Sequence, residues 1–143
     1  MTAGLPHLLV RTVGDEALVG PLVLPGRTAC VHCADLHRSE HDPSWGRYLA
    51  QLGPPRPGEL PPCDTPLALM TVAYAVQTAL GFLDGEEPSA VGAELQFGPG
   101  APLAARIEVP PHVACACGAL GDAPDAQRLV PSPGDVPRVE LLE

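Results

Sequence analysis

Residues 19–38 read VGPLVLPGRTACVHCADLHR, and this stretch decides the fold. Its apolar beginning, Val19 to Leu24, continues a strand that the dipeptide Pro25-Gly26 then breaks. Cys30 and Cys33 follow in a Cys-x-x-Cys spacing, which lets two thiols from one tight turn point the same way. We therefore expect the first cysteine pair to lie on a tight loop and to bind a metal ion.

A second close pair, Cys115 and Cys117, follows near the other end of the chain, after an intervening stretch of residues 34–114. Zinc favours four thiolates in a tetrahedron, each sulfur about 2.3 Å from the metal. Two pairs among only five cysteines are stronger support for a metal site than one Cys-x-x-Cys alone. The sequence predicts one structural zinc ion held by Cys30, Cys33, Cys115 and Cys117, with no open position to activate water.

Alternative interpretations of these cysteines stay open. Cys30 and Cys33 can form a dithiol redox centre, or the cysteines can be small buried apolar residues. A redox pair usually opens a helix after a strand, whereas Cys30 follows Pro25-Gly26, which favours the metal site. Nearby histidines can also replace one thiolate, with His112 the best substitute among His32, His37, His41 and His112.

Cys63 stands apart from both pairs, just ahead of an expected helix. Backbone N–H groups and the dipole at a helix N-terminus favour a thiolate, so Cys63 is the candidate catalytic residue. A lone cysteine without an assigned base is more often inert.

Two β-hairpins are expected from short apolar, β-branched runs separated by glycine-containing turns. The first joins residues 7–13 to residues 17–24, and the second joins residues 93–97 to residues 103–109. Together with the helices described next, they predict an α/β fold of small hairpins around one long buried helix.

Two helices are expected between the hairpins. The first begins after the cap Asp42 and ends near Gly53. Residues 54–62 contain five prolines and predict an extended linker. The second is capped by Thr65 and runs through residues 66–83, which carry no charge. Because this second helix is apolar all round, we expect it to be buried between layers or against a partner.

The composition restricts the partners and the location. Seventeen acidic residues oppose eight basic ones, and a net charge of −9 repels a phosphate backbone, so nucleic acid is not an expected partner. Residues 66–83 approach the length of a membrane span, but polar Thr71 and Gln77 favour a soluble helix. Residues 1–6 show no secretory signal, so we expect a cytoplasmic protein. The zinc-binding domain is expected over residues 1–120, followed by a flexible tail, residues 121–143, with an edge strand.

The motifs in residues 19–38 resemble those of a known family. The run Gly-Pro-Leu-Val-x-Pro-Gly, then Cys-x-x-Cys and Leu-His-Arg, continuing through Asp42 to Leu52, resembles the C-terminal half of E1-like (ThiF/MoeB-type) adenylyltransferases. More narrowly, it is similar to the cyclodehydratase-associated branch that takes part in the biosynthesis of azole-modified (TOMM) ribosomal peptides. The resemblance covers residues 7 to about 118, and the segment His112 to Cys117 is similar to that branch's closing zinc pair.

This resemblance implies a structural zinc on the same four cysteines. Cys63 occupies a place like that of the thioester- or persulfide-forming cysteine of some E1-like enzymes, on which the azole branch generally does not rely. Full-length members have a preceding nucleotide-binding half, which is missing here, so we expect no independent enzyme.

The expected function is noncatalytic scaffolding or docking in ribosomal peptide modification. The expected partners are a YcaO-type cyclodehydratase or a separate N-terminal E1-like half, with a precursor peptide and a second copy as further possibilities. The alternatives are an enzyme component that uses Cys63 as an acyl or sulfur carrier in ubiquitin-like or sulfur-carrier activation, and a thiol redox protein.

Overall fold

The computed structural model describes residues 4–51, 62–99 and 105–121. In this part of the chain, two hairpins form one antiparallel sheet in the order β1-β2-β3-β4. The strands are β1 (His7–Val13), β2 (Glu16–Val23), β3 (Ala93–Phe97) and β4 (Ala105–Glu108). The helices are α1 (Val31–His41), α2 (Trp45–Gln51) and α3 (Thr65–Leu83).

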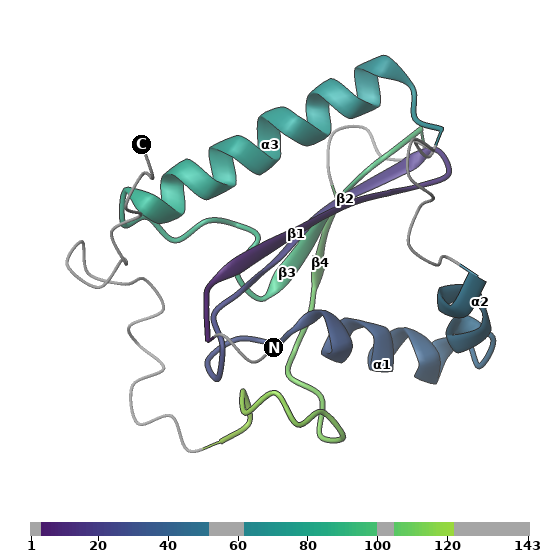
Figure 1. Cartoon of the computed structure of the whole chain (residues 1–143), viewed down its shortest axis with the longest axis vertical. Helices are drawn as coiled ribbons and strands as arrows, with labels where there is room; N and C mark the ends of the chain where they lie inside the picture. The colour runs from purple at the N-terminus through teal and green to yellow at the C-terminus, as the bar shows by residue number, and fades with distance from the viewer. Residues whose placement is uncertain (1–3, 52–61, 100–104, 122–143) are drawn as a thin grey trace, which may run out of the picture.

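The sheet has a helix layer on each side. Helix α3 lies across β1 and β2 on one face, whereas α1 and α2 lie on the opposite side (Figure 1). Because successive side chains of a strand point to opposite faces, β2 and β3 contribute to both layers. Ala17, Val19, Leu95 and Phe97 pack with Leu67 of α3.

Both predicted hairpins are confirmed. β1 pairs antiparallel with β2, and β3 pairs antiparallel with β4. The pairing of β2 with β3 then joins the two hairpins into one sheet. At this junction Gly20 has a φ of 120°, and a Cβ there would collide with the carbonyl oxygen of Ala93. The glycine of the Gly-Pro-Leu-Val motif therefore allows the backbones of β2 and β3 to approach closely.

Two predictions about the helices need correction. Cys30 and Cys33 do not lie on a loop, because Cys30 is the N-cap of α1 and Cys33 lies in its first turn. The cap of α3 is Asp64 and not Thr65: the Asp64 carboxylate accepts a hydrogen bond from the Leu67 N–H at 2.7 Å. An aspartate accepts this bond as well as a threonine does, so the sequence pattern left the choice between neighbouring caps open.

Helix α3 is buried along one narrow face only. Its buried residues are Leu67, Thr71, Thr78 and Phe82. The other large apolar side chains of α3 are exposed. The sheet therefore covers one face of this all-apolar helix, and the predicted burial on its other faces is not seen. By length and composition α3 is also able to cross a membrane, with 22% of the relevant window buried.

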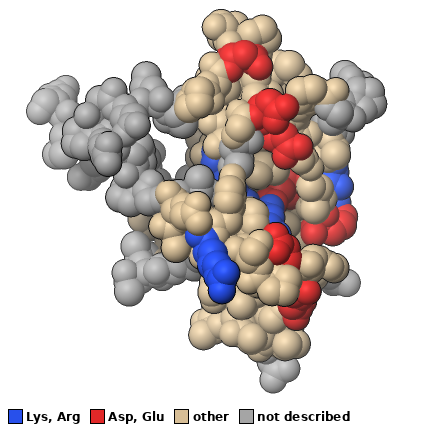
Figure 2. Space-filling view, turned by 90° about the vertical axis from the view of Figure 1, so that its right-hand side faces the viewer, with Lys and Arg blue, Asp and Glu red and all other residues tan. Residues whose placement is uncertain are grey.

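The predicted helix after Asp42 is confirmed as α2. Most of the linker, residues 54–61, lies outside the described residues, as do residues 122–143 with their expected edge strand. On the face shown in Figure 2, acidic side chains occur in several places with arginines between them, and the view shows no continuous basic surface.

A buried charged group ties α1 to the sheet. Glu94 of β3 is fully buried, and its carboxylate accepts hydrogen bonds from Arg11 of β1, at 3.2 Å, and from Arg38 of α1. Two guanidinium groups offset the large cost of burying one carboxylate. Glu94 therefore joins three elements that are far apart in the sequence.

Replacing Glu94 by alanine is expected to lower the free energy of unfolding by about 3 kcal/mol, because two largely buried guanidinium groups lose their partner. The matched control is Glu108→Ala. The Glu108 side chain is 74% exposed beside Arg106, and its loss should cost less than about 1 kcal/mol. Denaturant unfolding of both variants tests this, and equal effects would contradict the role given to Glu94.

Candidate metal centre

The first cysteine pair is positioned by the N-terminus of α1. Strand β2 ends at Val23, the chain turns through residues 24–29, and α1 then begins after Cys30. Both Cys30 and Cys33 are buried, and they pack with Val23, Ala29, Ala34 and Val109. The free N–H groups and the dipole of a helix N-terminus stabilise negative charge, which favours the thiolate form there.

The second cysteine pair is carried by a turn that follows β4. The Cys115 N–H donates to the His112 carbonyl at 2.9 Å, which closes a tight turn before Cys117. Cys115 and Cys117 are half-buried and pack against the same cluster as the first pair. The fold thus brings both predicted pairs together from opposite ends of the described chain.

The four sulfur atoms lie at the spacing of a tetrahedral thiolate site. All four Sγ atoms fall within 4.8 Å of one another. The separations are 3.9 Å for Cys30–Cys33, 3.6 Å for Cys30–Cys115 and 3.6 Å for Cys33–Cys117. A tetrahedron with metal–sulfur bonds of about 2.3 Å has edges of about 3.8 Å, whereas a disulfide needs about 2.05 Å. The residues present therefore fit zinc, and all five cysteines are free thiols.

Burial and hydrogen bonding among the thiols shift their pKa values in different directions. Burial acts to raise the pKa of Cys33, but hydrogen bonds from the backbone at His112 and Cys30 and from the Cys115 and Cys117 thiols outweigh it and bring this pKa down to about 7. Burial raises the pKa of the Cys115 thiol to about 12, and the hydrogen bonds that this thiol donates to Cys33 and Cys30 contribute to the increase. Burial also raises the pKa of Cys30. A thiolate on Cys33 is thus favoured first, and metal uptake has to displace the remaining protons.

The structure removes our objection to a dithiol redox centre at Cys30 and Cys33, but it adds no evidence in favour of one. A strand does lead into a helix at Cys30, so the local arrangement that we expected to be missing is present. However, Cys30 and Cys33 each contact a sulfur of the second pair. A dithiol redox centre does not need that second pair, whereas a tetrahedral metal site does.

His112 lies outside the sulfur cluster and holds its turn in place. The His112 Nδ1 accepts from the Ala114 N–H at 3.0 Å, so Nε2 carries the proton and donates to Glu40 of α1 at 3.0 Å. This hydrogen bond lowers the pKa of the Glu40 carboxyl. With both ring nitrogens engaged, neutral His112 has no lone pair left for a metal ion, and the expectation that it is the best substitute ligand loses its basis.

His37 and Glu40 complete a link between α1 and the C-terminal segment. The His37 Nε2 lies 3.0 Å from the Pro110 carbonyl oxygen, and its ring packs against His112 with centroids 4.7 Å apart. His37, Glu40 and His112 form a second group with metal-ligand atoms close together. Their hydrogen bonds explain the grouping without a metal. The sequence analysis did not identify Glu40 as a partner of these histidines. Its spacing from His37 (i, i+3), which places the two side chains on one face of a helix, was the available signal.

Cys63 lies apart from the other four cysteines. It is half-buried just before α3 and packs in the cluster that contains Leu67 and Phe97. Its thiol faces the Asp64 carbonyl oxygen at 3.6 Å. The structure confirms the position ahead of the long helix, and the hydrogen bond found for this thiol goes to a backbone carbonyl, which is not a general base.

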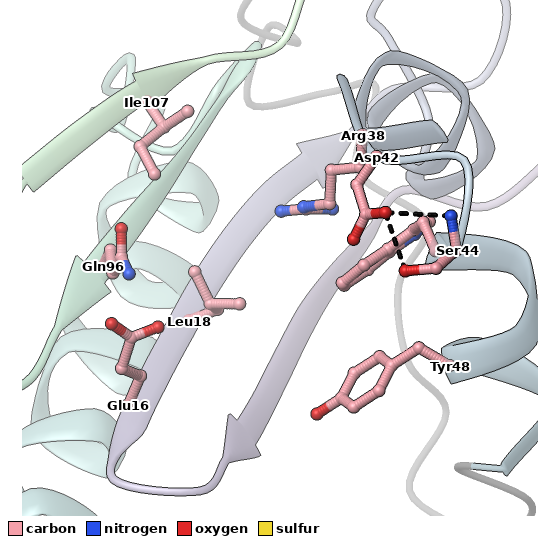
Figure 3. Close-up of a pocket in the computed structure, with 9 residues that line it drawn as sticks. Glu16, Leu18, Arg38, Asp42, Ser44, Tyr48, Gln96 and Ile107 are labelled. Atoms are coloured by element: carbon pink, nitrogen blue, oxygen red, sulfur yellow. Dashed lines mark hydrogen bonds between the residues drawn. The ribbon is translucent and has the colours of Figure 1, made fainter. Parts of the chain in front are cut away.

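An open groove of about 400 Å³ lies between the sheet and helices α1 and α2. Leu18, Gln96 and Ile107 form its sheet side, and Arg38 and Tyr48 lie on its helix side (Figure 3). Trp45 of α2 also lines the groove. The Trp45 and Tyr48 rings lie 5.4 Å apart, and the Arg38 guanidinium lies 5.3 Å from the Trp45 ring centre. The groove thus offers apolar and aromatic surface with one cation, bordered by the carboxylates of Glu16 and Asp42.

Comparison with known proteins shows a likeness of fold. No family model and no curated protein matches the sequence. Solved structures of Escherichia coli MccB are similar: with MccA the TM-score is 0.57 at 18% identity, and with ATP it is 0.58 at 19% identity. Both cover 81% of this chain and 32% of MccB, so the chain spans about a third of that protein. The likeness fits the expected C-terminal region of an E1-like fold.

Replacing His112 by alanine is expected to weaken zinc binding by about 10- to 100-fold, because the turn that carries Cys115 and Cys117 loses its bond to α1. Competition with a chromophoric chelator measures this affinity. His41→Ala is the control, since His41 is exposed at the end of the same helix. An unchanged affinity in the His112 variant would refute the positioning role.

Proposed function

We propose that this chain is a noncatalytic, zinc-stabilised module with an E1-like C-terminal fold that docks within a complex modifying ribosomally made peptides. The observation that carries the proposal is the sulfur tetrahedron formed by Cys30, Cys33, Cys115 and Cys117. The rest of the proposal is supported by the motif resemblance in residues 19–38 and by the likeness of fold to MccB.

In this proposal zinc supplies a cross-link and no reaction chemistry. The four thiolates fill the coordination sphere, so no position remains for water or substrate. The protein's own residues prepare the site: α1 orients Cys30 and Cys33, and the bond between His112 and Glu40 fixes the turn that carries the second pair. The function of the module is then to present a rigid surface to its partners.

The groove beside α1 and α2 is the surface that we assign to docking. It is open to solvent, and its Trp45 and Tyr48 rings with Ile107 and Leu18 offer the aromatic and aliphatic contacts typical of binding sites. Strand β4 forms one edge of the sheet beside the groove, and all four of its residues are exposed. An extended peptide segment can pair with such an edge while its side chains enter the groove.

ATP chemistry is assigned to the partner. The chain has no lysine and no glycine-rich phosphate loop in its sequence. A separate N-terminal E1-like half or a YcaO-type cyclodehydratase in the cytoplasm supplies the nucleotide site, and the precursor peptide is the shared substrate. MccB, 32% of which is covered by the aligned part of this chain, has been solved with ATP and with MccA.

A second candidate function uses Cys63 as an acyl or sulfur carrier. It is favoured by the position of Cys63 before the N-terminus of α3. The Cys63→Ser variant discriminates the two functions: full activity of the complete peptide-modifying system supports the noncatalytic module, and loss of activity with zinc retained supports the carrier.

Zinc removal is expected to unfold the chain. Apparent binding free energies of about 10–16 kcal/mol for structural zinc match or exceed the usual 5–15 kcal/mol stability of a domain. Protein purified without chelator should hold one zinc per chain and lose its circular dichroism signal with a strong chelator. The Cys117→Ser variant should bind no zinc and should be unfolded, whereas the Cys63→Ser variant should bind zinc and stay folded. A folded, metal-free Cys117→Ser variant would contradict the proposal.

Docking is expected to depend on the groove. Ile107→Glu places a charge between the sheet and Trp45 and should weaken binding to the precursor peptide or cyclodehydratase at least tenfold, because the charge loses its hydration on contact. Val113→Glu is the matched control, because Val113 is 88% exposed and outside the groove. Titration calorimetry measures the affinity. Equal binding by both variants would exclude this surface.

The assignment of ATP chemistry to the partner is tested separately. A thermal shift of this chain with ATP alone would contradict that assignment.

A further inference from the structure

The open groove beside α1 and α2 combines a largely apolar floor with an acidic rim. Leu18, Gln96 and Ile107 lie on three adjacent strands and form the floor, where Ile107 is 40% exposed. Figure 3 shows Glu16 on the sheet side of the groove and Asp42 on the helix side. A ligand in this groove therefore meets hydrophobic surface on the floor and a carboxylate at either border.

The carboxylates of Glu16 and Asp42 have no cationic partner within the described part of the chain. None of the ion pairs found there includes either residue, and both residues are exposed. Hydrogen bonds from the hydroxyl and from the backbone N–H of Ser44 lower the pKa of the Asp42 carboxyl, which keeps it ionised. Both carboxylates are thus available to a cation that comes from outside the domain.

The arginines near the groove do not cancel this negative charge. Arg38 lies at the groove, but its guanidinium is bound by the buried carboxylate of Glu94 and lies 3.6 Å from Asp35. Arg11 also pairs with Glu94. Two arginines are therefore matched by two acidic groups. Arg47 is exposed on α2, but at about 100° per residue it points roughly 100–160° away from the two aromatic residues of that helix. The charge left at the groove is negative.

We propose that the groove selects a peptide segment by a basic side chain, an inference that rests on the docking role proposed above and makes it more specific. The aliphatic stem of this side chain lies on the floor, and its charged head lies between Glu16 and Asp42. Long cationic side chains bury their stems on apolar surface in this way while the head stays in water. The net charge of −9 also favours a basic segment over an acidic one.

Arginine suits the groove better than lysine. Trp45 already has the Arg38 guanidinium 5.3 Å from its ring centre, which leaves the Tyr48 ring, 38% exposed, for an incoming cation. In Figure 3 the Tyr48 side chain points from α2 towards the sheet. A planar guanidinium can stack on such a ring and bind a carboxylate through two hydrogen bonds, whereas an ammonium is a compact, strongly hydrated charge. We therefore expect arginine to bind best, followed by lysine, an uncharged residue and an acidic residue.

The fluorescence of Trp45, the single tryptophan of the chain, reports binding to the groove in the zinc-loaded protein. The probes are three capped peptides, Ala-Val-Xaa-Val-Ala, with arginine, its uncharged analogue citrulline, or glutamate at Xaa. We expect a dissociation constant below about 1 mM for the arginine peptide, about tenfold weaker binding of the citrulline peptide, and still weaker binding of the glutamate peptide. Because the rim is exposed, added salt should weaken only the arginine peptide. Equal binding of the arginine and citrulline peptides, or no binding of the arginine peptide at roughly 5 mM, would overturn the proposal.

Neutral substitutions of the same shape test which carboxylates are responsible. Glu16→Gln and Asp42→Asn should each weaken the arginine peptide about three- to fivefold and leave the citrulline peptide unchanged. The double variant should bind both peptides equally, and asparagine keeps the hydrogen bonds to Ser44 that an aspartate accepts. Glu87→Gln is the control, because it removes the same charge from an exposed residue outside the groove. An arginine preference that survives the double variant, or that falls equally in Glu87→Gln, would contradict the proposal.

Failure of the basic preference is separable from failure of the docking role. Tyr48→Ala, like a charge placed on the floor at Ile107, removes apolar contacts and should weaken every peptide, whereas the rim substitutions change only the difference between charged and uncharged peptides. If Tyr48→Ala weakens the arginine and citrulline peptides that the unaltered chain binds equally, the groove is a docking surface and the preference alone is wrong. Zinc content and circular dichroism of each variant show whether the fold is intact.

Discussion

Contact among four cysteine sulfurs is the constraint on which the rest of the structure depends. It joins the N-terminus of α1 to the turn after β4 and so closes residues 34–114 into one loop. In the chain-entropy description, a cross-link of this span stabilises the folded state by about 4.5 kcal/mol, comparable to the total stability of a small domain. The chain has little aromatic core, at 3% Phe, Trp and Tyr, and many prolines and glycines, so such a staple replaces burial that the sequence does not provide.

The Leu-His-Arg segment of α1 explains how the same helix organises the rest of the domain. His37 contacts the Pro110 carbonyl oxygen and thereby holds the segment that leads to the second cysteine pair. Arg38 reaches in the other direction, to the buried carboxylate of Glu94 in β3. One helix therefore carries two metal-ligand candidates, a link to the C-terminal turn and an ion pair to the sheet. These roles give the motif a physical reason beyond its resemblance to a family.

Patterns that act locally were predictable from the sequence, and those set by tertiary contact were not. The apolar, β-branched runs and glycine-containing turns predicted both hairpins, and the cap residue Asp42 predicted α2. Helix α1 was missed because its sequence, with three histidines and few apolar residues, has almost no amphipathic signal. The cysteine pairs were identified by spacing alone, whereas Glu40 and Glu94 acquire their importance only from partners 72 and 56 residues away, on other elements.

X-ray absorption at the zinc edge of the purified chain tests the central claim most directly. A structural site formed by Cys30, Cys33, Cys115 and Cys117 predicts four sulfur neighbours at about 2.3 Å and no lighter ligand atom. A spectrum with nitrogen or oxygen in the coordination sphere, or a folded chain without metal, would contradict the account, because the two ends of the domain would then be joined by something other than the thiolates.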